Sequence, residues 1–297
     1  PISSAMFITA TAPNPLIVTF LSQGTDGVLN MTWGMWAIAA LLPAVVSLLV
    51  MPIVIWWLYP PAITRTPNAP QFARQKLDLL GPLSLAEKIT LAVFILLLCL
   101  WAGVPAMIMG SGWTVNPTSA ALIGLSILLL TGVLHWEDIL KCRGAWDTIV
   151  WFAALVMMAD FLSKLGLVGW LATSVGTAIN HLGVHWSIAT LLLILLYVYS
   201  HYFFASTTAH ITAMFSAFFI AGLGLGAPPA LLGLMLGFSS SLMMSLTHYG
   251  TGTAPIIFGS GYATLAEWWK TGLVMSVVNL TIWAVTGAFW WHWLGYW

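Results

Sequence analysis

The stretch HYFFASTTAHITAMF, residues 201–215, places two histidines, three threonines and a serine in the middle of a long apolar run. Polar groups in a bilayer must be bonded within the protein, so a helix can be interrupted there only where protein or a water-filled cavity covers the break. We therefore expect a discontinuous membrane helix at this stretch. The break itself marks a candidate binding site.

The composition indicates a membrane protein. Hydrophobic residues make up 60% of the 297 residues and charged residues 5%, with eight basic and eight acidic side chains. A soluble domain needs charge on roughly a quarter of its residues. The balanced charge is unfavourable for nucleic acid, and two cysteines, Cys99 and Cys142, are too few for a disulfide framework or a metal site. We expect an all-α polytopic protein in the lipid bilayer, with no cofactor.

Apolar runs of about 20 residues predict spanning helices. They cover residues 36–58, 89–109, 118–134, 148–163 and 271–294. Two further runs are interrupted, residues 188–226 by the quoted stretch and residues 230–258 by SLTHYGTGTAP, residues 245–255. We predict broken helices at both. Residues 165–180, LGLVGWLATSVGTAIN, suit a helix lying along the outer surface.

Basic residues predict the orientation. If the spans alternate, seven of the eight lie on one side, opposite Lys164; they are Arg65, Arg74, Lys76, Lys88, Lys141, Arg143 and Lys270. Short cytoplasmic loops favour Lys and Arg, so this side is predicted to be cytoplasmic. The side assigned to each basic residue is the same whether the interrupted run 188–226 re-enters or crosses the membrane, so the assignment does not distinguish the two. Since the chain begins with Pro1 rather than Met, we expect an N-terminal part to precede it.

Tryptophans gather near the predicted span ends, where their amphipathic rings suit the membrane interface. We interpret nine of them as interfacial anchors: Trp33, Trp113, Trp136, Trp146, Trp268, Trp269, Trp290, Trp291 and Trp293.

The tip of the first break has the chemistry of an anion site. Ala205, Ser206, Thr207 and Thr208 supply small side chains, three hydroxyls and the start of the following helix. The N-terminus of a helix carries partial positive charge, which suits a carboxylate. The simpler alternative is that these hydroxyls bond to carbonyls of their own helix. Three in a row between two helical arms favour a site.

The second break is repeated in the sequence. TATAP at residues 9–13 and TGTAP at residues 251–255 match at four of five positions, and Ser3 keeps the spacing of Ser245. Two broken helices facing each other across a site are typical of transporters built by internal duplication. Coincidence in a chain rich in Thr and Pro is the alternative.

Three histidines, His201, His210 and His248, lie in or beside the breaks, where a protonated ring could replace a bound cation. The other four, at 135, 181, 185 and 292, are predicted to be structural, as is Asp160, four residues before Lys164. Signatures of hydrolases, zinc enzymes and phosphate loops are absent from the sequence. We therefore do not expect an enzyme.

The residues resemble a known family. FASTTAH around Ser206, TAPN at residues 11–14 and THYGTGTAPIIFGSGY at residues 247–262 are similar to the divalent anion/sodium symporters, with SILLLTGVLHWEDIL and AWDTIVWFAALV extending the resemblance along the chain. Within that family they most resemble bacterial citrate/succinate and tartrate/succinate antiporters and the plastid 2-oxoglutarate/malate translocator.

The resemblance implies an elevator transporter, a homodimer with inverted repeats, each carrying a re-entrant hairpin. Residues 1–58 then end the first repeat, residues 59–88 form a cytoplasmic linker, and residues 89–297 form the second repeat. In that repeat the hairpin spans about residues 186–226, the broken helix about 230–258 and the last span about 271–294. The protein is expected in the bacterial cytoplasmic membrane.

The family's tip motif is Ser-Asn-Thr, so the resemblance carries Ser206 and Thr208 over directly, with Thr207 in place of the Asn. It also implies substrate contacts at the breaks, from Thr11, Pro13, Asn14, Thr251, Gly252, Thr253 and Pro255. Cation or charge-compensating positions are Ala205, His210, His248 and Gly250. Because His248 stands beside the cation position, we favour exchange of di- or tricarboxylates. The alternatives are a sodium-coupled symporter, an intramembrane enzyme using the three histidines, and a structural membrane subunit.

Overall fold

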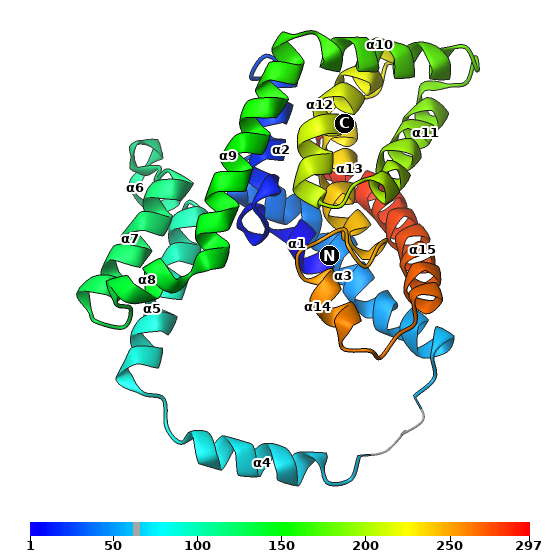
Figure 1. The fold of residues 1–297 in the computed structure, drawn as a ribbon. Helices are drawn as coiled ribbons and strands as arrows, with labels where there is room; N and C mark the ends of the chain where they lie inside the picture. Colours follow the sequence, from blue (N-terminus) through cyan, green and yellow to red (C-terminus); the bar gives the residue numbers. More distant parts are fainter. Residues whose placement is uncertain (62–65) are drawn as a thin grey trace. The chain divides into compact units, whose positions relative to one another are not determined.

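A computed structural model describes residues 1–61 and 66–297, apart from a set of side chains between residues 111 and 163. The predictions for Arg65 and for the side chain of Asp160 lie outside these residues. The described chain contains helices and no strand, as predicted, and it divides into two compact units (Figure 1). One unit comprises Pro1–Met51 with Thr148–Trp297, and the other is Pro52–Asp147.

The helices of the first unit are concentrated around the two predicted breaks. In chain order they are α1 (Ile2–Met6), η1 (Ile8–Ala10), α2 (Pro13–Gly24), α3 (Trp33–Leu58), α9 (Arg143–Lys164), α10 (Leu167–Asn180), α11 (Trp186–Tyr199), η3 (Ser200–Phe203), α12 (Thr207–Gly224), α13 (Pro229–Leu242), η4 (Met243–Ser245), α14 (Ala254–Gly259), α15 (Leu265–Ile282), the π-helical turn η5 (Trp283–Gly287) and α16 (Ala288–Trp293). Helices α3 and α9 continue into the second unit.

The second unit contains α4 (Ala69–Leu80), α5 (Leu85–Trp101), α6 (Val104–Met109), η2 (Ser111–Trp113), α7 (Pro117–Leu130) and α8 (Trp136–Lys141). Helix α4 falls inside the predicted linker and was not foreseen. The prediction of one span over residues 89–109 is wrong, because α5 ends at Trp101 and Gly103, with φ of 74°, separates it from α6.

Four helical segments of the described chain are long and apolar enough to cross a membrane: Trp33–Leu58, Trp186–Phe203, Thr207–Gly224 and Leu265–Trp293. A fifth arises if the bent pair α4 and α5 is counted as one span. Both predicted interruptions are confirmed, since α11 and α12 are separated by a 3-10 turn and α13 and α14 by a non-helical segment. The helix predicted along residues 165–180 is present as α10.

Small residues on α13 let α2 pack closely against it. A Cβ built on Gly233 would lie 2.6 Å from Leu21 Cδ2, and one built on Gly237 would lie 3.3 Å from Ile17 Cγ2. Positions four apart on α13 therefore meet positions four apart on α2 in reverse order, so the two helices are antiparallel. Close approach through small residues is the usual basis of helix packing in membranes, where lipid removes most of the hydrophobic drive.

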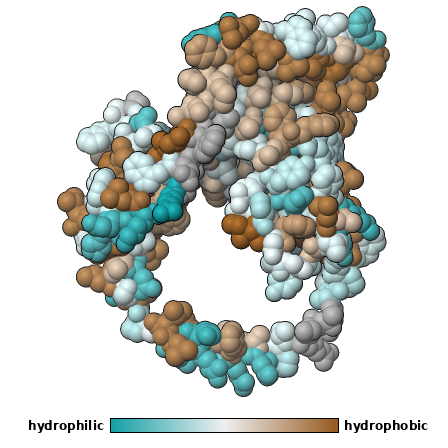
Figure 2. Space-filling view, in the orientation of Figure 1, coloured by the Kyte–Doolittle hydropathy of each residue, from teal (hydrophilic) through white to brown (hydrophobic). Residues whose placement is uncertain are grey.

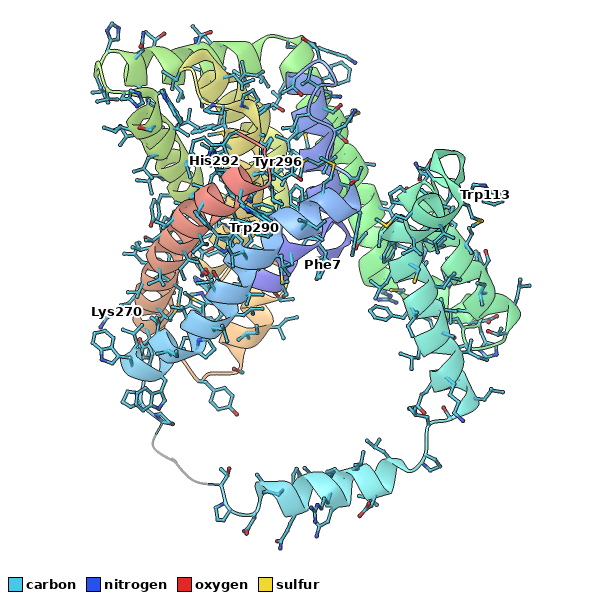
Figure 3. All side chains as sticks on the ribbon, turned by 180° about the vertical axis from the view of Figure 1, so that it is seen from behind. Phe7, Trp113, Lys270, Trp290, His292 and Tyr296 are labelled. Atoms are coloured by element: carbon cyan, nitrogen blue, oxygen red, sulfur yellow. The ribbon has the colours of Figure 1, made fainter. Side chains whose placement is uncertain are left out.

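Tryptophans near the C-terminus bond to α3 rather than to a membrane interface. The Trp291 indole donates to the Ala39 carbonyl at 2.8 Å. The Trp290 indole, labelled in Figure 3, donates to the Ile38 carbonyl at 2.7 Å. The partner of the Ala39 carbonyl in a regular helix would be the amide of residue 43, which is proline. Trp291 is completely buried, so its interpretation as an interfacial anchor is wrong. It supplies the donor that Pro43 lacks.

We predict that Trp291→Phe destabilises the full-length protein by about 1–3 kcal/mol, because an aromatic ring remains at the position but the Ala39 carbonyl loses its donor. Thermal unfolding in detergent measures this loss. The matched control is Trp293→Phe, whose side chain is 69% exposed and should change stability by less than about 0.5 kcal/mol. In a Pro43→Ala background the helix supplies its own amide, so the loss should shrink. An equal loss in both backgrounds would contradict this account of Trp291.

Candidate functional site

The hairpin tip is tied to the second break by one residue. Ser206 has extended φ and ψ of −149° and 130°, and its hydroxyl accepts from the Ala209 amide at the start of α12. Next to it, the backbone amide and the hydroxyl of Thr207 both donate to the Gly250 carbonyl, at 3.0 and 2.9 Å. Thr207 thus gives Gly250, in a segment without helical bonds, the hydrogen bonds that a membrane environment requires.

Gly250 allows this contact because two polar side chains crowd it. A Cβ built there would lie 2.6 Å from His201 Nε2 and 2.6 Å from Thr247 Oγ1. Both side chains are fully buried. Neither ring nitrogen of His201 nor the Thr247 hydroxyl has a hydrogen-bond partner in the described part of the chain. Buried polar atoms are nearly always bonded, so this small cluster has unused capacity for a ligand, an ion or water.

The first break is held together by Asn14. Its side-chain amide donates to the carbonyls of Ser4 and Phe7, both at 2.9 Å, and so bonds the chain on the far side of the break. Its carbonyl oxygen accepts from the Ser241 hydroxyl at 3.4 Å. Ser241 lies on the last turn of α13, directly before the second break. The buried Asn14 side chain therefore connects the two breaks.

Helices α2 and α12 run in parallel and bring a third element to the same place. The rings of Phe20 and Phe215 stack at 6.1 Å, and a Cβ on Gly24 would lie 2.8 Å from the ring of Phe219. Both partners advance by four residues in the same direction, so the helix N-termini lie at the same end. The tip before α12 and the first break before α2 thus share one end of the pair. Each N-terminus contributes partial positive charge there.

The predicted site residues differ in their exposure. Pro13, Asn14, Thr207, His210 and Gly250 are buried; Thr11, Ser206, Thr208, His248 and Thr251 are half-buried; and Ala205, Gly252, Thr253 and Pro255 are exposed. The Thr251 hydroxyl lies 3.1 Å from that of Thr253 and accepts from the Ala254 amide at 3.2 Å, so it caps α14. The Thr11 hydroxyl is buried without a partner in the described chain.

His248, predicted to stand beside the cation position, bonds to a tryptophan. The indole of Trp269 on α15 donates to His248 Nδ1 at 3.4 Å. Because an indole nitrogen only donates, Nδ1 is the acceptor in this contact. His210 also has partners, with Nε2 3.0 Å from Ser200 Oγ and Nδ1 3.1 Å from Met243 Sδ. The histidine beside Gly250 is His201.

Sequence spacing alone did not distinguish His201 from the other two histidines. The distinguishing signal is the 3-10 turn η3, which turns His201 inward at the end of α11, stacked 5.3 Å from His210. His210 in turn lies between the rings of Tyr197, at 4.7 Å, and Phe204, at 4.6 Å. In the described chain, no group of three or more His, Cys, Asp and Glu side chains is arranged to hold a metal ion.

Interrupted membrane helices that meet through hydroxyls and helix N-termini are typical of secondary transporters. The chain matches, over residues 1–297, the family described as the sodium:sulfate symporter transmembrane region. It therefore belongs to that family, as the tip and break motifs indicated.

Relatives occur in plastids and in bacteria. Dicarboxylate transporter 1, chloroplastic, of Arabidopsis thaliana is 44% identical over 100% of this chain and 52% of its own length. A candidate malate transporter of Bacillus subtilis (strain 168) is 48% identical, over 100% and 60%. Inner membrane protein YbhI of Escherichia coli (strain K12) is 35% identical, over 98% and 59%. The chain spans about half the length of the curated relatives it matches. The names of the first two are those of transporters, in agreement with the prediction that the chain is not an enzyme.

We predict that Gly250→Ala lowers the stability of the full-length protein by about 1–3 kcal/mol, because the new methyl group forces His201 and Thr247 apart. Thermal unfolding is again the measurement. Gly252→Ala is the matched control in the same segment, since a Cβ there has open space, and its effect should stay below about 0.5 kcal/mol. Equal effects of the two substitutions would show that the close approach at Gly250 has no energetic role.

Proposed function

We propose that the protein containing this chain is a secondary transporter that exchanges di- or tricarboxylates of the citrate, tartrate, succinate and malate type across the bacterial cytoplasmic membrane. The observation that carries the proposal is that the Ser206–Thr208 tip meets the second break through Thr207 and Gly250, while Asn14 of the first break bonds to Ser241 at the end of α13. Family membership and the names of the plastid and Bacillus relatives support a carboxylate as substrate.

Within the tip, the three residues divide into two roles. The hydroxyl of Thr207 is occupied by the Gly250 carbonyl, so we assign it to holding the tip in place. Ser206 and Thr208 remain for the substrate, and the Thr208 amide has no acceptor in the described chain. Hydroxyl and amide donors at the start of a helix suit one carboxylate group.

At the breaks, Thr11 supplies an unbonded hydroxyl beside Pro13, the first residue of α2. Asn14 is a positioning residue, because both of its amide hydrogens are used on backbone carbonyls. Thr251, Gly252, Thr253 and Pro255 form the more exposed rim of the second break.

The substrate's negative charge needs a counter-charge inside the bilayer. We assign it first to the N-terminal ends of α2 and α12, which share one end of their parallel pair. His248 Nδ1 accepts from the Trp269 indole, and the histidine beside the tip contact is His201. Transport would follow the elevator scheme, in a homodimer, with the empty carrier unable to return easily.

A sodium-coupled dicarboxylate symporter is the second candidate. The unbonded Thr247 hydroxyl beside Gly250 favours it, because hydroxyl and carbonyl oxygens are suitable ligands for a hard cation. The family's description as sodium:sulfate symporters favours it as well.

We predict that full-length protein in liposomes preloaded with succinate takes up labelled citrate, malate or tartrate without sodium. Ser206→Ala and Thr208→Val should each weaken apparent substrate affinity about tenfold or more, because each removes a hydrogen bond to a charged group. Ser260→Ala, an exposed hydroxyl outside the site, is the control. Uptake that needs sodium and no internal substrate would identify a symporter. Absence of carboxylate transport both in preloaded liposomes without sodium and in sodium-driven uptake would refute the carrier proposal.

His248→Gln is predicted to leave the exchange rate and its pH profile between about pH 6 and 8 unchanged, because the His248 ring bonds to the Trp269 indole and the histidine beside Gly250 is His201. The rate of counterflow at several pH values tests this. His201→Gln serves as the comparison and should reduce exchange, since His201 lies against Gly250. If the exchange rate of His248→Gln no longer depended on pH, the charge-compensating role would belong to His248.

A further inference from the structure

Helix α4 has an apolar side that nothing in its unit covers. None of its residues is buried, and Phe72, Leu77, Leu79 and Leu80 are 62%, 66%, 81% and 79% exposed. Figure 2 shows polar and apolar residues side by side along this segment, at the bottom of the view. An exposed row of large apolar side chains on a short helix is unstable in water and calls for a partner.

The apolar and polar residues of α4 lie largely on opposite sides, with Lys76 as the exception among the apolar residues. At 3.6 residues per turn, the four large apolar residues share one side with Ala73. The opposite side carries Gln71, Gln75 and Asp78. Arg74 lies at the boundary between the two sides. Such a division fits a helix half-immersed at a membrane surface.

The direction of α4 relative to α5 fits a helix that lies at a membrane surface. Its axis is bent by 104° from that of α5 across a break of at most four residues, which contains Gly81, with φ of 70°, and Pro82. The two axes are therefore close to perpendicular. Helix α5 is apolar and begins with a complete capping box formed by Ser84 and Glu87. If α5 crosses the bilayer, α4 must lie close to the membrane plane.

The cations of α4 are placed for lipid headgroups. The Lys76 ammonium lies 5.4 Å from the centre of the Phe72 ring, so its stem follows the apolar side and its charge is at the end of a long flexible chain. Long basic side chains in this position reach up to the phosphate level. Arg74 lies at the boundary, while the single acidic residue of the helix, Asp78, is on the opposite side. The Lys76 charge is therefore on the apolar side of the helix, whereas Arg74 lies at its edge.

We propose that α4 is an in-plane membrane helix that binds anionic phospholipid, with its apolar side in the bilayer interface and with Lys76 and Arg74 on headgroup phosphates. The proposal is independent of the transport function, because it rests on the exposure, bend and charge of α4 alone. A phospholipid surface accounts for the apolar side and the cations together. A protein partner would need a separate acidic and apolar surface.

The test uses full-length protein with its native cysteines replaced, reconstituted in vesicles of phosphatidylcholine with phosphatidylglycerol. Bimane is attached to Ala73→Cys on the apolar side or to Gln71→Cys on the polar side. Aqueous iodide and lipids carrying a doxyl group near the headgroup are the two quenchers. Leu77→Cys and Asp78→Cys form a second pair, should either variant of the first pair fail to fold.

We expect doxyl lipid to quench bimane at position 73 severalfold more than at position 71, and iodide to do the reverse. Doxyl phosphatidylglycerol should quench position 73 more than doxyl phosphatidylcholine, and Lys76→Gln or Arg74→Gln should each reduce this preference about fivefold. Iodide quenching at both positions would place α4 in water, and no quenching at position 73 would show that protein covers it. Either result, or equal quenching by the two lipids, would overturn the proposal.

Discussion

The structure depends on one requirement, that every backbone group freed by a broken helix finds a partner inside the protein. Side chains from distant parts of the sequence meet it. Asn14 bonds to the carbonyls of Ser4 and Phe7, Thr207 donates twice to Gly250, and Trp291 supplies the donor that Pro43 lacks. Each contact also fixes two elements relative to each other. Satisfying the backbone and assembling the site are therefore achieved by the same bonds.

This requirement decides which polar residues remain for a ligand. Thr207 and Asn14 are used to hold the tip and the first break, although their residue types alone suit carboxylate recognition. Ser206, Thr208 and Thr11 can still donate a hydrogen bond to a ligand, because their hydroxyl groups donate to no backbone carbonyl in the described chain. A polar residue at a break is thus a ligand candidate only after the backbone's needs have been met. Its partners, rather than its type, assign its role.

The breaks themselves could be predicted from the sequence, since clustered hydroxyls, glycines and prolines are unfavourable in a continuous membrane helix. The sequence did not predict which polar residues at the breaks bond to the backbone and which remain for a ligand. His248 is closer in sequence to Gly250 than His201 is, yet the local turn directs it to Trp269 on α15. Trp291 has the composition of an interfacial anchor, and only its distance to Ala39 reveals its role. Helix α4 was not predicted from the sequence, because it is short and none of its residues is buried in its own unit.

Close backbone contacts, in addition to the hydrogen bonds, hold the second break in place. A Cβ on Gly272 of α15 would lie 2.5 Å from the Ser245 carbonyl oxygen and 2.9 Å from that of Leu246, at the start of the second break. These are backbone atoms that cannot rotate away, so α15 fixes the path of the chain as it leaves α13. On its other side α13 is held by α2 through Gly233 and Gly237. The second break is thus held on one side by backbone contacts at Gly272 that leave no room for a side chain, and on the other by close side-chain packing at Gly233 and Gly237.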